Sequence, residues 1–253
     1  MKILIDNNLI NYTVSGFGRP LIFLHGWGCD LHTFDKLGIQ LSEDYKVYQI
    51  DLPGFGESEI KESFNIEKYA DIINKFCLSL AIINPILVGH SFGGRIAIKY
   101  ASLYKIEKLV LMCSPGIKQR FNLITWFKIK LYKLCIKLKI KNKMGSVDYK
   151  NADKVLREVL VKAINTDLTE DAKKINCKTL LLYSKKDRSV PLYVGKKLHK
   201  LINNSTFFEI RRSGHFPYID RFRFVLIILK SFFNGEVLWL SYWYLFLLNY
   251  IIY

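Results

Sequence analysis

The 253-residue sequence lacks the features that mark an exported or zinc-stabilised protein. Its five cysteines are an odd number, are widely spaced and form no Cys-x-x-Cys pair: Cys29, Cys77, Cys113, Cys135 and Cys177. This pattern argues against a disulfide framework and a zinc site, and it favours a reducing compartment. An acidic residue, Asp6, stands where an export signal would need an apolar run. We therefore predict a cytoplasmic protein.

Acidic residues are also scarce. The sequence has 22 Asp and Glu and 38 Lys and Arg, which gives a net charge of +16. The excess is local: residues 116–163 hold 13 Lys or Arg and three Asp or Glu. A basic balance suits nucleic-acid or membrane partners. The aromatic residues of the basic segment, Trp126, Phe127 and Tyr132, stand at helical positions typical of packing. We therefore predict no nucleic-acid partner.

The order of strand and helix candidates predicts an α/β protein with a mostly parallel sheet flanked by helices. Half of the residues are apolar, and the length suits one large domain. The nearly continuous apolar run at 20–24 is typical of a strand buried on both faces. Strands are expected at 2–5, 10–14, 20–24, 45–50, 85–88, 108–112, 179–183 and 206–210, and helices at 32–43, 66–80, 93–103, 192–201 and 218–233.

Residues 115–171 contain no strand candidate and are predicted to form a small helical cap inserted after the sixth strand. The core is then 1–114 and 172–233. Within 121–143, apolar residues and lysines recur on opposite faces at three- and four-residue steps, which predicts a cationic amphipathic helix. A second cap helix is expected at 151–164.

Residues 234–253 form an apolar, aromatic-rich C-terminal tail. From Val237 to Tyr253 the tail has 17 residues without a charge, six of them Trp or Tyr, which favour a membrane interface. Three interpretations stay open: a membrane-associating tail, a helix packed on the body or on a partner, and a non-native extension. The cationic cap helix favours peripheral membrane contact, although its apolar face is also suited to covering an active site.

The segment Gly89-His90-Ser91-Phe92-Gly93 follows a buried strand and precedes a helix. In this context Gly-x-Ser-x-Gly predicts a nucleophile elbow, with Ser91 on a strained turn and the Phe92 amide aimed at an oxyanion. His25-Gly26-Trp27-Gly28 directly follows the third strand, and we predict that the backbone amide of Trp27 is the second oxyanion donor. His25 itself is predicted to be structural.

A serine nucleophile needs a base and a carboxylate that orients the base. Asp187 lies in the loop after one buried strand, and His215 lies in the loop after the last strand. The order Ser, acid, His is expected when all three residues stand on loops at the carboxyl edge of such a sheet. The predicted triad is therefore Ser91, Asp187 and His215, and we predict neither a cofactor nor a metal.

These motifs, together with Asp51-Leu52-Pro53-Gly54-Phe55-Gly56-Glu57-Ser58, resemble the α/β-hydrolase superfamily over residues 1–233. The resemblance is to small capped carboxylesterases, lactonases and C–C bond hydrolases, and it implies the α/β-hydrolase fold and a structural Asp51. Serine at position 91 disfavours epoxide hydrolases and haloalkane dehalogenases, which carry Asp there. Gly93-Gly94-Arg95 also resembles the menaquinone-pathway synthases, where the corresponding arginine helps to hold an acidic substrate.

The sequence thus predicts a serine hydrolase that cleaves a small or medium carboxylic ester, thioester or lactone through an acyl-enzyme. Trp27 and Arg95 are the candidate substrate contacts. One alternative is a C–C bond hydrolase or a menaquinone-pathway synthase-like lyase with the same triad. Another is a non-catalytic small-molecule binding protein on a hydrolase scaffold, against which the complete triad argues.

Overall fold

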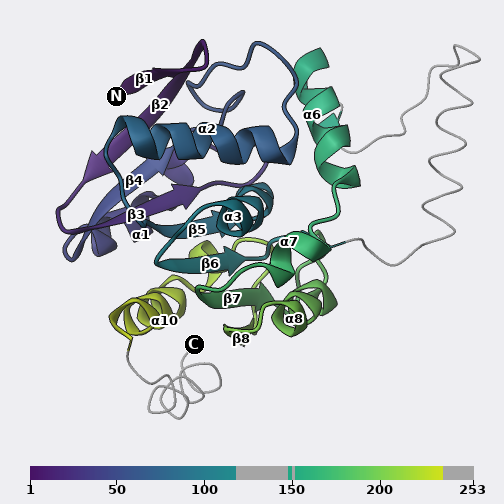
Figure 1. Cartoon of the computed structure of the whole chain (residues 1–253). Coiled ribbons are helices and arrows are strands. Elements are labelled where there is room, and N and C mark those ends of the chain that lie inside the picture. Colours follow the sequence, from purple (N-terminus) through teal and green to yellow (C-terminus); the bar gives the residue numbers. More distant parts are fainter. Residues whose placement is uncertain (118–147, 150–151, 236–253) are drawn as a thin grey trace, which may run out of the picture.

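The computed structural model describes residues 1–117, 148–149 and 152–235. The expected helix within 121–143 and most of the tail lie outside the described residues. Eight strands form one sheet in the order β1-β2-β4-β3-β5-β6-β7-β8 (Figure 1). The strands are β1 (Lys2–Ile5), β2 (Asn8–Ser15), β3 (Arg19–Leu24), β4 (Tyr45–Ile50), β5 (Ile86–His90), β6 (Lys108–Met112), β7 (Lys178–Ser184) and β8 (Ser205–Ile210).

β1 pairs with β2, and β2 with β4, in an antiparallel way. The six strands β3 to β8 are parallel to one another. The mostly parallel sheet predicted from the sequence is therefore confirmed. The described helices are η1 (Leu31–Phe34), α1 (Asp35–Leu41), α2 (Ile66–Ser79), α3 (Phe92–Leu103), α6 (Lys154–Asn165), α7 (Thr169–Lys173), α8 (Leu192–Leu201), α9 (Pro217–Asp220) and α10 (Phe222–Asn234).

Helices cover both faces of the sheet, and β3 shows how its sequence produces this arrangement. Side chains of a strand alternate between its two faces. Ile22 and Leu24 pack in the apolar cluster that contains side chains of α2, α3 and α8, whereas Leu21 and Phe23 pack in the cluster of α1 and α10. All four side chains are buried. The apolar run at 20–24 is continuous because both faces of β3 need apolar residues.

The expected helix over 218–233 is wrong in one respect, because the structure has two helices there. α9 ends at Asp220, and Arg221 has φ −132° and ψ 45°, outside the helical region. The Asp220 carboxylate accepts hydrogen bonds from the Gly214 amide (2.7 Å) and the Ser213 hydroxyl (3.2 Å), so it ties α9 to the preceding loop. The apolar periodicity continues across this bend and therefore gives no sign of it.

The chain leaves the sheet after β6 and returns at β7, and α6 and α7 lie in this insertion (Figure 1). α7 packs on the core through an ion pair of 2.6 Å between Lys99 of α3 and Asp171. The predicted boundary between residues 171 and 172 falls inside α7, and the division into core and cap stays a prediction. Among the described residues, no helix is long and apolar enough to cross a membrane.

Candidate active site

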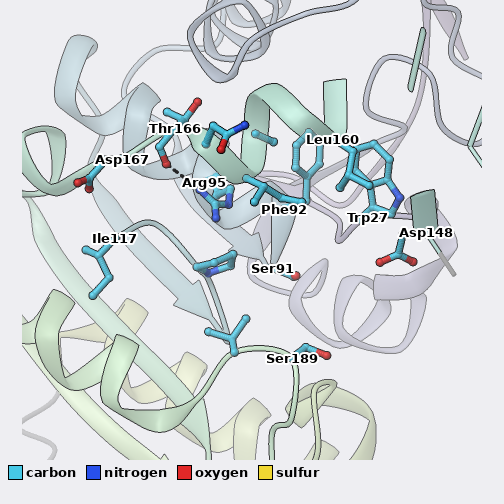
Figure 2. Close-up of a pocket in the computed structure, with 15 residues that line it drawn as sticks. Trp27, Ser91, Phe92, Arg95, Ile117, Asp148, Leu160, Thr166, Asp167 and Ser189 are labelled. Carbon is cyan, nitrogen blue, oxygen red and sulfur yellow. Dashed lines mark hydrogen bonds between the residues drawn. The ribbon is translucent and has the colours of Figure 1, made fainter. Parts of the chain in front are cut away.

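Ser91 stands on a sharp turn between β5 and α3 and lines a cavity of about 390 Å³ (Figure 2). Its backbone has φ 49° and ψ −112°, a conformation that costs a non-glycine residue about 1–3 kcal/mol. Glycine is required on both sides of the turn. A Cβ on Gly89 would lie 2.7 Å from Gly94 Cα, and one on Gly93 would lie 2.1 Å from the Leu24 carbonyl oxygen.

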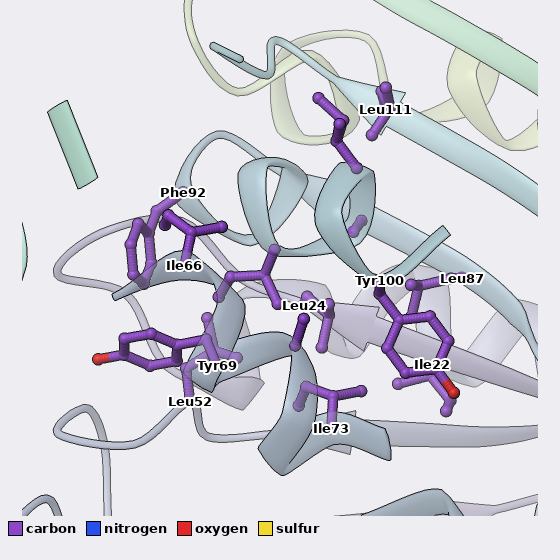
Figure 3. Close-up of a cluster of buried hydrophobic side chains, with 14 of the residues drawn as sticks. Ile22, Leu24, Leu52, Ile66, Tyr69, Ile73, Leu87, Phe92, Tyr100 and Leu111 are labelled. Atoms are coloured by element: carbon purple, nitrogen blue, oxygen red, sulfur yellow. The ribbon is translucent and has the colours of Figure 1, made fainter. Parts of the chain in front are cut away.

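The first turn of α3 is held from two sides. The Phe92 ring is packed edge-on against Tyr69 of α2 at 5.2 Å, within the apolar cluster shown in Figure 3. The Gly93 amide donates to the His25 carbonyl at 3.0 Å. The amides at the start of a helix have no acceptor within the helix, so the Phe92 amide can serve an external acceptor.

His215 follows β8 and lies between Ser91 and Asp187. Its Nε2 is 2.9 Å from Ser91 Oγ, and its Nδ1 is 2.7 Å from Asp187 Oδ2. An ionised carboxylate only accepts hydrogen bonds, so Nδ1 carries the proton and Nε2 presents a lone pair to the Ser91 hydroxyl. The three residues predicted to form a triad therefore lie within hydrogen-bond distance in the required order.

Asp187 is held by backbone as well as by His215. Its Oδ1 accepts hydrogen bonds from the amides of Ser189 (2.7 Å) and Val190 (2.9 Å). Burial raises the pKa of the Asp187 carboxyl, but the hydrogen bonds from His215 and from these amides outweigh burial and leave the pKa below its usual value. Asp187 is therefore ionised at neutral pH and can balance a positive charge on His215.

The loop that carries Trp27 is fixed by His25, which is fully buried. His25 Nε2 accepts a hydrogen bond from the Leu52 amide at 3.0 Å, which joins the loops after β3 and β4. The Trp27 ring packs edge-on against Phe55 (4.9 Å) and Phe92 (5.3 Å). Trp27 therefore lies beside the elbow and lines the same cavity as Ser91.

Asp51 ties three segments together, as the resemblance implied. Its carboxylate accepts hydrogen bonds from the Leu31 amide (2.7 Å), the Asn11 side chain (2.8 Å) and the Glu57 amide (2.9 Å). Gly56 has φ 54°, and a Cβ there would lie 2.3 Å from the Asp51 carboxylate. The acidic residue and the glycine therefore form one structural turn.

The cavity beside Ser91 combines an apolar wall with one buried cation (Figure 2). Its apolar lining includes Trp27, Phe92, Ile117, Leu160 and Val190. Arg95, in the first turn of α3, donates to the Thr166 carbonyl at 3.1 Å. Burial lowers the pKa of Arg95 to about 10 and the charge of Asp167 opposes this, so Arg95 is still a cation at neutral pH.

Comparisons with known proteins identify the family of this chain. The profile of the alpha/beta hydrolase fold family matches residues 19–134. The uncharacterised hydrolase YugF of Bacillus subtilis is 30% identical over 228 residues, which cover 78% of this chain and 83% of YugF. The pimeloyl-[acyl-carrier protein] methyl ester esterase of Vibrio cholerae is 28% identical, over 82% of this chain and 91% of that protein.

A crystal structure of the meta-cleavage product hydrolase CumD superposes with a TM-score of 0.74 at 25% identity, covering 93% of this chain and 98% of that one. The chain belongs to the α/β-hydrolase superfamily. Its relatives named as esterases and hydrolases further show that it is an enzyme of the hydrolase type. This counts against the alternative of a non-catalytic binding protein.

One further group lies next to the candidate triad of this α/β hydrolase. Cys113 Sγ, a carboxylate oxygen of Asp187 and a ring nitrogen of His215 lie within 4.8 Å of one another. Burial raises the pKa of the Cys113 thiol to about 12, and Sγ is 3.6 Å from Ser184 Oγ. Nucleophilic attack and metal binding both need the thiolate. The protonated, fully buried thiol of Cys113 is therefore poorly suited to either, whereas the Ser91 hydroxyl lines the cavity.

Sequence reasoning missed three parts of this site. The amides of Ser189 and Val190 hold Asp187 through backbone atoms, which leave no side-chain signal. Thr166, from the insertion, meets Arg95 across 71 positions of sequence. The imidazole of His90 contacts the loop of His215, although the motif alone gave it no role.

Proposed function

We propose that this α/β hydrolase is a serine esterase that uses Ser91, His215 and Asp187 as nucleophile, base and orienting acid. The observation that carries the proposal is the pair of hydrogen bonds made by His215 beside a cavity that Ser91 lines: its Nε2 accepts from the Ser91 hydroxyl at 2.9 Å, and its Nδ1 donates to Asp187 at 2.7 Å. A serine hydroxyl is a weak nucleophile until a neighbouring base takes its proton. His215 Nε2 is in position to do so.

The reaction follows from these contacts. Ser91 Oγ attacks the ester carbonyl carbon while its proton passes to His215 Nε2, and the carbonyl electrons move to oxygen. The tetrahedral intermediate collapses, and His215 returns the proton to the departing alcohol. Water then attacks the acyl-enzyme with the same base, which releases the acid and restores the Ser91 hydroxyl. Asp187 stabilises the imidazolium at both stages.

The developing oxyanion needs donors that are already in place. We propose the backbone amides of Trp27 and Phe92. The hydrogen bond from Gly93 to the His25 carbonyl and the Trp27–Phe92 ring contact support this assignment, because they keep the two segments adjacent. Each lost donor in such a site costs about 10²–10³-fold in kcat.

The predicted substrate is a carboxylic ester with a small or medium acyl group, or a thioester or lactone. The apolar wall and the cavity of about 390 Å³ suit such a group, and a relative from Vibrio cholerae is named a methyl ester esterase. The direct test is steady-state hydrolysis of methyl and p-nitrophenyl esters of increasing chain length. Turnover that peaks at short or medium chains supports the proposal, and no turnover of any ester by folded protein contradicts it.

A second candidate is C–C bond hydrolysis with the same triad. The similarity to a hydrolase of meta-cleavage products favours it, and so does Arg95, a buried cation suited to a carboxylate. The related prediction of a menaquinone-pathway synthase-like lyase rests on the same arginine. Carbon–carbon cleavage of a carboxylated diketone, in the absence of ester turnover, would favour this candidate over the esterase.

If Arg95 binds substrate, Arg95→Met should discriminate between esters by charge. We expect KM for a monomethyl ester of a dicarboxylic acid to rise about 10- to 100-fold, as for the loss of a charge-assisted hydrogen bond of ~1.5–3 kcal/mol. KM for an uncharged ester of equal length should change little.

The matched control for Arg95 is Arg223→Met, on the exposed side of α10. Steady-state kinetics on both esters and a melting temperature for each variant complete the test. An equal change for both esters, together with a lower melting temperature, would mean that Arg95 acts only by holding the Thr166 carbonyl.

We also propose peripheral membrane contact, from residues that lie outside the described ones. The contributions of an apolar tail and of a lysine-rich segment to the free energy of membrane binding add together. Each lysine near an anionic surface contributes about 1 kcal/mol. The full chain should therefore float with anionic liposomes, and high salt should weaken flotation only in part. A chain ending at Asn234, the last residue of α10, should not float and should keep its esterase activity. Full-length protein that ignores liposomes would contradict this proposal.

A further inference from the structure

His90, the last residue of β5, is fully buried beside the loop of His215. Its Nε2 is 2.8 Å from the backbone carbonyl oxygen of His215, and its Nδ1 is 3.3 Å from the Tyr218 hydroxyl. Its ring centroid is 4.8 Å from that of His215, 4.9 Å from Phe216 and 5.1 Å from Tyr218. One imidazole therefore contacts most of the segment from His215 to Tyr218.

The partners of His90 determine its tautomer. A carbonyl oxygen only accepts hydrogen bonds, so Nε2 carries the proton and donates to the His215 carbonyl. Nδ1 is then an acceptor, and the Tyr218 hydroxyl donates to it. Burial lowers the pKa of His90 to about 3, so this neutral form persists across the physiological range.

His90 also lies against the loop that carries the candidate oxyanion donor Trp27. A Cβ added to Gly26 would lie 2.8 Å from His90 Nδ1 and 3.4 Å from Ser91 Cβ. The imidazole therefore fills the space where three segments meet: the elbow of Ser91, the loop of Trp27 and the loop of His215.

Tyr218, which donates to His90, is itself held by packing. Tyr218 is buried in α9, and its ring lies 4.8 Å from Phe34 of η1, in the apolar cluster of α1 and α10. The packing of the Tyr218 ring therefore fixes the position of the hydroxyl that donates to His90. The buried imidazole of His90 fixes the His215 carbonyl by a hydrogen bond and so restricts the His215 backbone. The position of the His215 Cα in turn sets where the His215 imidazole can lie.

We propose that His90, held by Tyr218, is a positioning residue that sets the distance between the His215 imidazole and Ser91 Oγ. The inference rests on the proposed function of the triad and adds a residue to it. His90 touches neither the substrate nor the transferred proton. Its loss should therefore lower the rate of the chemical step and leave substrate binding nearly unchanged, because small misplacements of a base can cost up to about 10²-fold.

The test compares two amides at position 90. The amide nitrogen of Gln is as many bonds from Cβ as Nε2 of His, so His90→Gln can still donate to the His215 carbonyl. His90→Asn is one bond shorter and cannot reach it. We expect His90→Asn to lower kcat roughly 10- to 100-fold with KM within about threefold, and His90→Gln to recover kcat to within about fivefold of wild type.

Two further variants make the outcome decisive. His199→Asn, in α8 and bonded to Ser205 at 2.8 Å, should leave the kinetics unchanged. Tyr218→Phe keeps the ring and removes the donor to His90, and it should lower kcat severalfold at unchanged KM. If His90→Asn does not fold, Tyr218→Phe decides the question, and wild-type kcat in that variant overturns the proposal.

Labelling of Ser91 by a fluorophosphonate separates this inference from the proposed function. If the wild-type chain is not labelled on Ser91, the triad assignment itself fails. If it is labelled, yet the Asn and Gln variants have equal kcat, or KM alone changes, the positioning role of His90 fails and the triad stands.

Discussion

Replacing Ser91 with alanine should abolish ester hydrolysis, with kcat falling on the order of 10⁶-fold. The residual rate would come from the oxyanion donors and the cavity, which the substitution leaves in place. Folding should be preserved, because the left-handed backbone at φ 49° already strains any residue with a Cβ and alanine adds no new clash. Substrate binding should also persist, so that a bound ester is retained without turnover.

The matched control is Ser79→Ala at the exposed end of α2, which should have wild-type kinetics. Both variants are measured by steady-state turnover of the best ester and by melting temperature. Activity in Ser91→Ala within about tenfold of wild type, at equal purity, would contradict the assignment of Ser91 as nucleophile.

Asp187→Asn should cost on the order of 10³–10⁴ in kcat. Asn can donate a hydrogen bond to His215 Nδ1. The imidazole would then present the lone pair of Nδ1 to the Asn amide and carry its proton on Nε2. A protonated Nε2 cannot accept the proton of Ser91. The amides of Ser189 and Val190 would still bond the side-chain oxygen, so the loop should keep its geometry.

The control for Asp187 is Asp71→Asn, a partly exposed acid in α2 that pairs with Lys68 and Lys75. Its kcat should stay within about twofold of wild type, since exposed ion pairs contribute little to stability. A fully active Asp187→Asn variant would show that the orienting acid stands elsewhere in the fold.

Much of the fold was predictable because local patterns and global topology agree. The apolar run at 20–24 predicts a strand buried on both faces, and β3 indeed faces two apolar clusters. Ser91, Asp187 and His215 each follow a strand, and the carboxyl ends of parallel strands meet at one edge. Their meeting could therefore be inferred without coordinates.

What could not be predicted depends on contacts between distant segments. The bend at Arg221 interrupts an apolar periodicity that runs on unchanged into α10. The bond between Arg95 and Thr166 joins the elbow helix to the insertion. His90 lies in the elbow motif, but its partners are on the loop after β8 and on α9, 125 and 128 positions away. Sequence position alone does not specify such partners.

The most direct test of the central claim is fluorophosphonate treatment of the full chain, followed by mass spectrometry of the digested protein. The proposed mechanism predicts one covalent phosphonyl adduct, on Ser91, which forms slowly in Asp187→Asn because the base is misoriented. The Ser91→Ala variant should carry no adduct. An adduct on another serine or on a cysteine, or no adduct on folded wild-type protein that hydrolyses esters, would contradict the triad of Ser91, His215 and Asp187.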